Sequence, residues 1–404
     1  MASTSVLQNV LDGNIHKTIP ASTYDDKLAA TYQNIPVPQK ATTFNPDVHL
    51  NYFASPQAKE KYHSTKRITL KELGHDDKPG SISPIGVSDP FPLFTQEAVD
   101  IMRSEVLQRD TFLKYARYCF NSTSGMDCTL RGYVKSNEDG IVCPFTYAAW
   151  THPKTMALVS QMAGIELEII MDYEIAHTNI SLKSEDEAFE EKLKHQRSLL
   201  DSKTGRSMSS DGKDIPAVVG WHNDSYPFVC VLMLSDTTNM IGGETMFRMG
   251  KTKSTDTDED TFGNVAIVPG PTQGSACVLQ GRLIEHLAPS PQGVSERITM
   301  VTSYRARNPK LADTSILSTA KPEVNYGSRY NEFYGQWVGY RVELMKEKLD
   351  LVKKECRGEG DKGRFNKEET IKTLKDIEEY LAKTYKEMEL TEEEVAKMYK
   401  KDLV

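Results

Sequence analysis

The stretch GWHNDSYPFVCVLMLS, residues 220–235, places a histidine and an aspartate two positions apart, directly before an apolar run. Short apolar runs bounded by Gly, Pro, Asn or Asp are typical of buried strands. The same pattern continues through residues 215–308, where short apolar segments alternate with turn residues. Many short strands with closely spaced turn signals predict an antiparallel sandwich or barrel.

Helices are expected before this β region. Thr95 is a suitable N-cap, and Val99, Met102 and Val106 follow it with the spacing of a buried helical stripe. A second helix is predicted within residues 151–165, which carry a proline near the start and a glycine near the end. The predicted fold class is therefore mainly β with flanking helices, an α+β protein.

Composition divides the chain into three parts. Residues 1–90 are rich in Pro, Ser, Thr, Lys and Asp without lasting periodicity, which predicts an N-terminal arm packed on the core. Residues 91–330 are expected to form the main domain, with residues 183–214 as a charged surface insertion containing some helix. Residues 331–404 predict a charged helical extension, which would either cover the core or form a homodimer surface.

Composition also excludes several classes of function. The chain has 404 residues, 38% of them hydrophobic, so a sizeable core is expected. The formal net charge of −8 gives no basic footprint for nucleic acid or an acidic membrane. The six cysteines show no CxxC, and neither a signal-peptide pattern nor a long apolar span occurs. These features predict a cytoplasmic protein with reduced thiols.

The opening stretch also contains a candidate metal site. Residues two apart on a strand point to the same side, so His222 and Asp224 can bind one ion together. A third ligand should come from another strand, and His286 in GRLIEHLAP is the best candidate. Two histidines and one carboxylate on one face suit non-haem Fe(II). The alternative is a polar turn and a strand histidine bonded to a backbone carbonyl.

The strand that begins ERITMVTSY carries a candidate anion site. Alternation puts Arg297, Thr299 and Val301 on one face. An arginine that faces a barrel interior needs an anion, and a dicarboxylate co-substrate would supply one through a bidentate pair. A structural carboxylate, Glu244 or Glu285, is the alternative partner of Arg297.

The order of these elements resembles the Fe(II)/2-oxoglutarate-dependent dioxygenases. It consists of the HxD of His222 and Asp224, the GGETMF of residues 242–247, His286, and Arg297 followed by Thr299. The resemblance implies a double-stranded β-helix (jelly-roll) core. It also implies Fe(II) at the triad, and 2-oxoglutarate and O₂ as co-substrates, with Arg297 and Thr299 holding 2-oxoglutarate.

Segments outside the core are similar to a group of fungal oxygenases, many of them in secondary metabolism. Some of these oxidise free branched-chain amino acids, including an aziridine-forming type. The similarity implies oxidation of an unactivated C–H bond of a small molecule by hydroxylation, desaturation or cyclisation. Two alternatives stay open: a protein- or peptide-acting hydroxylase, because GGET also occurs in prolyl-hydroxylase-like enzymes, and a metal-binding jelly-roll protein without catalysis.

Four further residues are candidates for contacts with the substrate. Arg131 could bind a substrate carboxylate or form a structural salt bridge, and Trp221 could line the pocket or fill the core. Tyr173 and Asn179 would face the same way if residues 173–182 were one extended strand. The intervening His177 is expected to be a satisfied core or rim histidine rather than a fourth ligand.

Overall fold

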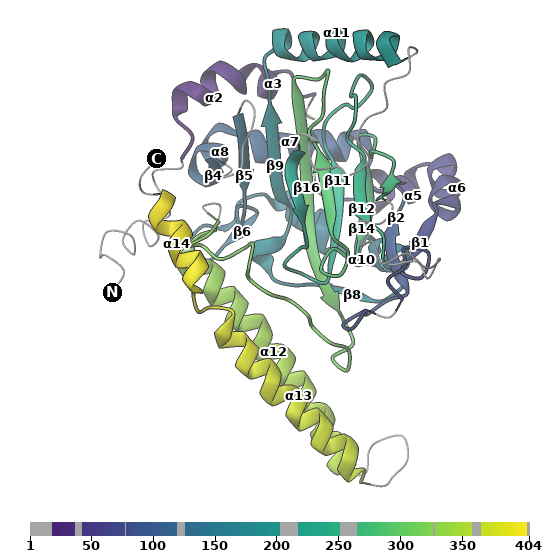
Figure 1. The fold of residues 1–404 in the computed structure, drawn as a ribbon, viewed down its shortest axis with the longest axis vertical. Helices are drawn as coiled ribbons and strands as arrows, with labels where there is room; N and C mark the ends of the chain where they lie inside the picture. Colours follow the sequence, from purple (N-terminus) through teal and green to yellow (C-terminus); the bar gives the residue numbers. More distant parts are fainter. Residues whose placement is uncertain are drawn as a thin grey trace.

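The computed structural model describes residues 18–36, 43–76, 78–118, 126–202, 217–250, 265–325, 328–357 and 365–401. Within these residues, helices surround two main antiparallel sheets (Figure 1). The architecture is therefore mixed α and β with a large antiparallel sheet, in agreement with the α+β prediction.

The large sheet contains most of the described strands. Eight of its strands follow the order β1-β2-β14-β11-β16-β9-β5-β4, while β3 pairs with β14 and β8 pairs with β16. Their bounds are β1 Arg67–Thr69, β2 Ile85–Ser88, β3 Phe91–Pro92, β4 Ala116–Tyr118, β5 Met126–Leu130, β8 Leu167–Ile169, β9 His177–Leu182, β11 Phe228–Met233, β14 Ser275–Leu279 and β16 Glu296–Ala306. The segment before residue 90 thus contributes β1 and β2 to the edge of this sheet.

The small sheet has the strand order β10-β15-β12-β13. Its strands are β10 Ala217–His222, β12 Thr245–Arg248, β13 Val265–Val268 and β15 His286–Pro289, and a separate hairpin joins β6 Lys135–Ser136 to β7 Gly140–Ile141. Along the chain, β9, β11, β14 and β16 belong to the large sheet, whereas β10, β12, β13 and β15 belong to the small one. The chain therefore passes repeatedly between two layers.

The two faces of the large sheet bury different side chains. Ile298 and Met300 of β16 lie in the main core cluster with residues of the neighbouring helices. Val301 packs instead in a second cluster with Phe247 of the small sheet. Because neighbouring strand residues point to opposite faces, Arg297 shares the face of Val301 and points into the space between the sheets.

The predicted helices before the β region are present. Thr95 accepts a hydrogen bond from the backbone N–H of Ala98, and Val99, Met102 and Val106 are fully buried in α7. The helices are α2 Ala21–Lys27, α3 Ala29–Gln33, α4 Pro46–His49, α5 Asn51–Ala54, α6 Pro56–Ser64, α7 Gln96–Leu107, α8 Arg109–Tyr115, α9 Pro144–Thr151, α10 Pro153–Ala163, α11 Glu185–Ser202, α12 Tyr330–Cys356, α13 Lys367–Lys386 and α14 Glu392–Lys401.

The prediction of continuous strand through residues 173–182 is wrong at its start. Asp172–Glu174 form a short 3₁₀ turn, and Ala176 adopts a left-handed φ of 58° before β9 begins. The backbone N–H of Tyr173 donates to Gln336 Oε1 of α12 at 2.7 Å, so contact with a distant helix replaces strand pairing here. In the charged insertion, α11 covers most of the described part, and residues 203–216 lie outside the described residues.

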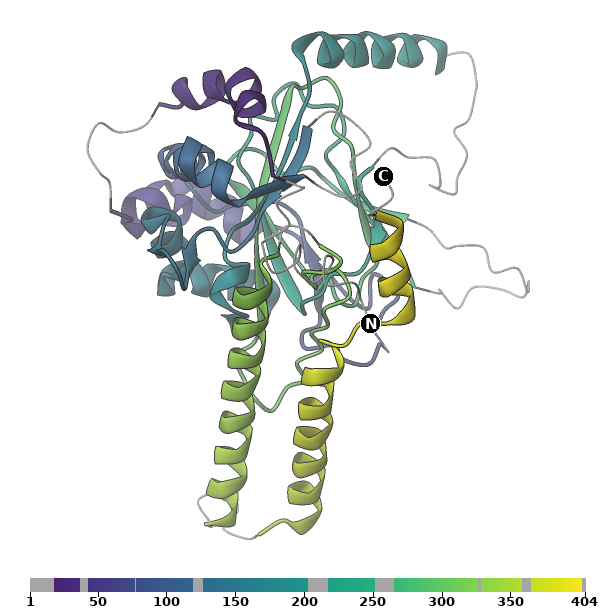
Figure 2. The ribbon, with the colours of Figure 1, turned by 90° about the vertical axis from the view of Figure 1, so that its left-hand side faces the viewer.

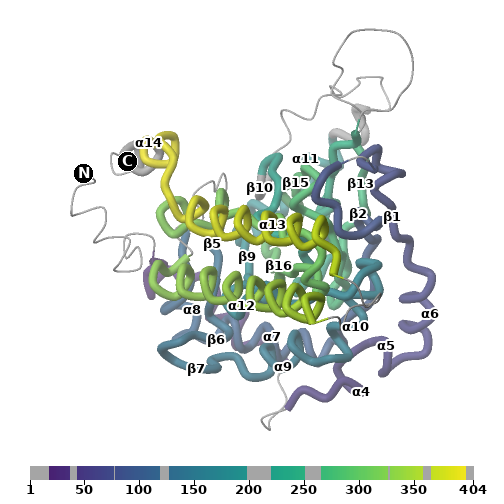
Figure 3. The backbone as a smooth tube through the Cα atoms, turned by 90° about the horizontal axis from the view of Figure 1, so that it is seen from below, coloured from purple at the N-terminus to yellow at the C-terminus, as the bar shows by residue number. Residues whose placement is uncertain are grey.

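The C-terminal helices form a long hairpin that extends away from the sheets (Figures 1 and 2). Seen from below, α12 and α13 lie side by side across the end of the body (Figure 3). At the base of α12, Phe333 and Trp337 pack with Tyr173 and Tyr226 of the body. No helix in the described residues is long and apolar enough to cross a membrane.

Candidate metal centre

The structure brings together the three residues that the sequence predicted as metal ligands. His222 ends β10, His286 begins β15, and the two residues face each other in the register of the small sheet. Asp224 lies between them: its carboxylate oxygens are 3.5 Å from His222 Nε2 and 3.7 Å from His286 Nε2. One ligand atom from each residue lies within 4.8 Å of the other two. The three side chains therefore converge on one point.

Backbone carbonyls orient both imidazoles. His222 Nδ1 donates to the carbonyl oxygen of Gly220 at 2.7 Å, and His286 Nδ1 donates to that of Ile284 at 2.9 Å. A hydrogen on Nδ1 leaves a lone pair on Nε2, which is the tautomer that binds a metal. In both residues Nε2 is the nitrogen directed at Asp224.

Asp224 is held in place by its backbone and has a free carboxylate oxygen. Its N–H donates to the carbonyl oxygen of Gly281 at 2.9 Å, while its buried Oδ2 has no hydrogen-bond partner among the described residues. Burial raises the pKa of Asp224, but its interactions with His286 and His222 outweigh that effect and leave this pKa below its usual value. The carboxylate is therefore ionised at neutral pH and ready to coordinate a cation.

This donor set fits Fe(II). Two neutral imidazoles and one carboxylate on one side of a metal are the ligands of non-haem Fe(II) oxygenases, which leave the remaining positions open for other ligands. Burial lowers the pKa of His286, which keeps it neutral and available near pH 7. An unsatisfied buried carboxylate oxygen next to two free imidazole nitrogens is costly unless a cation occupies the centre.

Arg297 lies on the inner face of the large sheet, and no carboxylate of the described part of the chain pairs with it. It is opposite Ser181 in β9, and Thr299, two residues further, is opposite Asn179. Its Nε is buried without a hydrogen-bond partner among the described residues, and burial lowers the pKa of Arg297 to about 10. The guanidinium therefore stays charged at neutral pH, and no carboxylate of the described residues compensates the charge.

The structural alternative for Arg297 finds no support in the described residues. Glu285 pairs with Arg248 at 2.9 Å, so it is engaged elsewhere. No ion pair joins Arg297 to Glu244 or to any other carboxylate of the described chain. An isolated buried cation is unfavourable, which makes a bound anion the natural partner.

Polar side chains line the sheet next to the triad. β5 ends at Leu130 and β9 begins at His177, so these two strand ends are neighbours in the large sheet. His177 Nε2 lies 2.6 Å from the hydroxyl of Thr129. Burial and the charge of Arg131 lower the pKa of His177, whereas Asp224 raises it. His177 therefore lies near the triad with a hydrogen-bond partner of its own.

The substrate candidates lie in different places. Arg131 is buried and donates to Glu174 Oε1 at 2.5 Å, and Tyr226 donates to the same oxygen at 2.9 Å. The hydroxyl of Tyr173 accepts a hydrogen bond from the backbone N–H of Arg329 at 2.6 Å, so Tyr173 belongs to the base of the hairpin. Of the pair predicted to face the same way, only Asn179 lies beside Thr299 on the inner face.

Trp221, near the end of β10, packs against Arg248 of the neighbouring part of the small sheet. The guanidinium of Arg248 stacks 4.5 Å from its ring centroid, and the same guanidinium pairs with Glu285. The indole Nε1 of Trp221 is buried without a hydrogen-bond partner among the described residues. Trp221 therefore stays a candidate for contact with the substrate.

Gly281, which was not among the residues predicted from the sequence, lies against Asp224. A Cβ at this position would lie 2.7 Å from Asp224 Cγ and would overlap the carboxylate oxygen. The only sequence signal is a lone glycine between a strand and a ligand histidine, which suggests close approach of the backbone.

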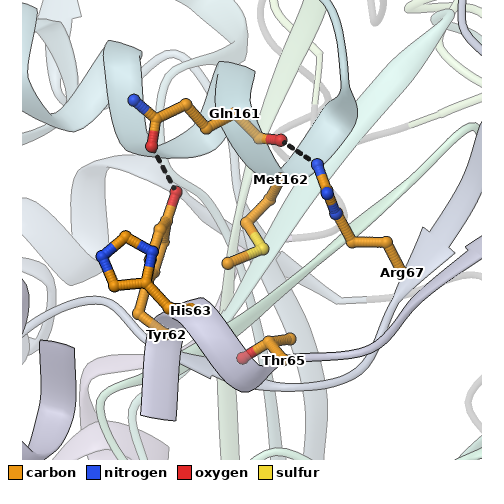
Figure 4. Close-up of a pocket in the computed structure, with 6 residues that line it drawn as sticks. All are labelled: Tyr62, His63, Thr65, Arg67, Gln161 and Met162. Carbon is orange, nitrogen blue, oxygen red and sulfur yellow. Dashed lines mark hydrogen bonds between the residues drawn. The ribbon is translucent and has the colours of Figure 1, made fainter. Parts of the chain in front are cut away.

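The molecule also has a hollow far from these residues. A cavity of about 260 Å³ between α6, β1 and α10 is lined by Tyr62, His63, Thr65, Arg67, Gln161 and Met162 (Figure 4). Tyr62 and Arg67 both hydrogen-bond to Gln161, as the dashed lines show. None of these residues belongs to the strands that carry the triad.

No family model matches the sequence, and no curated protein is similar to it. Among solved structures, the chain resembles a 2OG-Fe(II) oxygenase-family oxidoreductase from Burkholderia pseudomallei at 13% identity, covering 47% of this chain and 73% of that chain, with a TM-score of 0.28. It resembles a Pseudomonas putida prolyl-4-hydroxylase at 15% identity, covering 55% and 94% of the two chains, with a TM-score of 0.31. It also resembles SnoN, a non-heme alpha ketoglutarate dependent epimerase from nogalamycin biosynthesis, at 13% identity, covering 59% and 82%, with a TM-score of 0.34. Likeness at this level does not identify a family.

Proposed function

We propose that this protein is an Fe(II)- and 2-oxoglutarate-dependent oxygenase. One observation carries the proposal: His222, Asp224 and His286 converge with free ligand atoms, and the uncompensated Arg297 points into the space between the same two sheets. A cation site and an anion site between the same two sheets suit a metal that is chelated by a dicarboxylic keto acid.

The strand arrangement supports the jelly-roll core that the sequence resemblance implies. Between β9 and β16, the strands divide between two facing antiparallel sheets, and the ligand-bearing β10 and β15 are neighbours in the small sheet. A double-sheet arrangement of this kind encloses an inner space in which a small ligand can be held.

Each residue has a distinct role in the proposed site. His222, Asp224 and His286 would hold Fe(II). The bound metal would supply the chemistry that couples oxidative decarboxylation of 2-oxoglutarate by O₂, which gives succinate and CO₂, to oxidation of a substrate C–H bond. Arg297 would bind the distal carboxylate of 2-oxoglutarate in a charge-assisted pair, and the buried Thr299 would add a hydroxyl donor. The carbonyls of Gly220 and Ile284 keep both imidazoles in the ligand tautomer.

The position of the site favours a small molecule as the substrate. His286 is 7% exposed, the side chains of His222 and Asp224 are 25% and 20% exposed, and Tyr226, two residues beyond Asp224, is buried in the cluster formed with the base of α12. A partly enclosed site of this kind fits a small metabolite better than a protein segment, which needs an open groove. A free amino acid as the substrate, and a role in fungal secondary metabolism, would agree with the similarity of the sequence to fungal oxygenases.

The test is the formation of succinate by anaerobically iron-loaded protein after addition of 2-oxoglutarate, O₂ and a panel of free amino acids and short peptides. We expect turnover that one member of the panel stimulates and that Asp224→Ala abolishes. Asp350→Ala, which removes an exposed carboxylate on α12, is the matched control and should leave turnover unchanged. Equal turnover by the Asp224→Ala protein would contradict the proposal.

A further inference from the structure

The C-terminal hairpin carries an apolar surface that nothing in the described chain covers. Twelve large apolar side chains are strongly exposed in the described residues, and six of them lie on α12 and α13. These six are Val342 (42% exposed), Leu349 (46%), Ile371 (43%), Leu374 (45%), Leu381 (52%) and Tyr385 (52%). Scattered apolar side chains are ordinary on a surface, whereas a concentration on one element marks an interaction site.

These side chains are not the ones that join the two helices. Arg341, Leu344 and Met345 of α12 are buried, as are Tyr380 and Thr384 of α13. Arg341 Nε donates to the hydroxyl of Thr384 at 2.7 Å, and Arg341 Nη2 donates to the carbonyl oxygen of Tyr380 at 3.1 Å. The hairpin therefore has its own internal contact face, and the exposed residues form a second face.

The two exposed stripes lie on the same side of the hairpin. On α12, exposed Val342 follows buried Arg341, and on α13, exposed Leu381 and Tyr385 follow buried Tyr380 and Thr384. One residue along a helix is a rotation of 100° from the contact face. On both helices the exposed residues are thus turned by about 100° from the face through which the helices touch. Because the helices run in opposite directions, this turn brings the exposed residues of both helices to the same side of the hairpin.

The resulting face has the shape of half a four-helix bundle. Val342 and Leu349, and likewise Leu374 and Leu381, are seven residues apart, which is the spacing of helices that pack side by side. The shared length of about 20 residues is roughly 30 Å. With a width of about 20 Å for two helices, a matching hairpin would bury on the order of 600 Å² per copy, about 1,200 Å² in total, which reaches the range of specific interfaces.

Opposite charges on α12 and α13 can be matched between two copies of this face, although Lys346 also lies 2.9 Å from Glu343 of its own helix. Lys346 and Lys353 are exposed beside the apolar stripe of α12, whereas Glu378 is exposed within the stripe of α13. Arg341 and Thr384 are in contact, and the two helices run in opposite directions. Glu378, six residues before Thr384, therefore lies level with residue 347, six residues after Arg341. A two-fold axis along the hairpin would then set Glu378 of each copy next to Lys346 of the other.

We propose that the second apolar face of the α12–α13 hairpin binds the same face of a second copy of this chain, forming a four-helix homodimer. The hairpin extends beyond the sheets, so this face is accessible to a partner along its length (Figure 2). The surface is self-complementary in width, spacing and charge, which is what a two-fold interface requires.

The experiment measures the mass of the full-length protein by sedimentation equilibrium or light scattering over a range of micromolar concentrations. We expect about twice the chain mass of 45.4 kDa for the wild-type protein. Leu381→Glu should weaken the dimer by at least about 100-fold, because it puts a charge into each of two equivalent contacts. Residue 381 is half exposed, so the monomer should keep its circular dichroism spectrum and its unfolding temperature.

Two further variants keep the test specific. Phe189→Glu places the same charge at a residue that is 60% exposed on α11, and it should leave the dimer unchanged. Glu378→Lys should weaken the dimer, and adding Lys346→Glu to the same chain should restore it. A monomeric wild-type protein would overturn the proposal, and so would a dimer that Leu381→Glu leaves intact.

Discussion

Replacement of Gly281 by alanine tests the geometry of the metal centre without removing any ligand. The new Cβ would lie 2.7 Å from Asp224 Cγ and 3.1 Å from its Cβ, and it would overlap Oδ2. Carbon atoms in contact are separated by about 3.5 Å or more, so the carboxylate must retreat by roughly 1 Å. Protein ligands hold a metal within about 0.2 Å of the ideal distance, so this displacement takes Asp224 out of coordination.

The expected result separates stability from metal binding. The clash involves the end of a side chain that can rotate away, so we expect a loss of about 1–3 kcal/mol in the free energy of unfolding. Loss of the carboxylate from the centre should weaken binding of Fe(II), or of Co(II) as a spectroscopic probe, by about 100-fold or more. Gly339→Ala is the matched control, because a Cβ there meets no atom within 4 Å.

The assay is an anaerobic titration with Co(II), followed by visible absorbance, together with urea denaturation of both glycine variants. The control should bind metal like the wild-type protein. Wild-type affinity in a folded Gly281→Ala protein would refute the placement of Asp224 in the centre. Loss of folding in Gly281→Ala alone would show that close approach at this site supports the core rather than the metal.

Three further predictions concern buried side chains that carry or can gain a charge. Arg297→Ala should raise the dissociation constant of 2-oxoglutarate by about 30-fold or more while Fe(II) affinity is unchanged, since a buried charge pair is worth about 2 kcal/mol or more; equal affinity measured by calorimetry would contradict this. Arg131→Ala should lower the free energy of unfolding by about 3–5 kcal/mol, because it leaves the buried carboxylate of Glu174 unpaired; a loss below about 1 kcal/mol in urea denaturation would count against this. Burial lowers the pKa of His49, and its Nδ1 accepts a hydrogen bond from the N–H of Asn45 at 2.8 Å. Below about pH 6.5, this histidine therefore binds fewer protons in the folded state than in the unfolded state. Stability should therefore fall as the pH drops below that value, by at most about 1.4 kcal/mol per pH unit for this residue, and a His49→Gln protein with an unchanged pH profile of its unfolding temperature would contradict the assignment.

The placement of the candidate ligands could be read from the sequence because it depends on short-range rules. The spacing of His222 and Asp224, and the alternation that turns Arg297 inward, follow from strand geometry alone. The pairing of His222 with His286 needed the order of motifs as well, because 64 residues separate them. Thr95 and its buried stripe were equally predictable, since a helix cap and its periodicity are local signals.

Features that depend on distant contacts could not be predicted. The turn at Tyr173 exists because Gln336 and Phe333 of α12 hold it, and no local pattern encodes that contact. Glu174, the partner of Arg131, was hidden within a segment that resembled continuous strand. Gly281 acts through the space it leaves for Asp224, which is visible only once the two backbones are side by side.

The most direct test of the proposed function is an anaerobic calorimetric titration of 2-oxoglutarate into the protein, with and without Fe(II). The site described here predicts one equivalent of 2-oxoglutarate bound tightly in the presence of Fe(II), and much weaker binding in its absence or in Asp224→Ala. Failure of the iron-loaded wild-type protein to bind 2-oxoglutarate, or equal binding by Asp224→Ala, would contradict it.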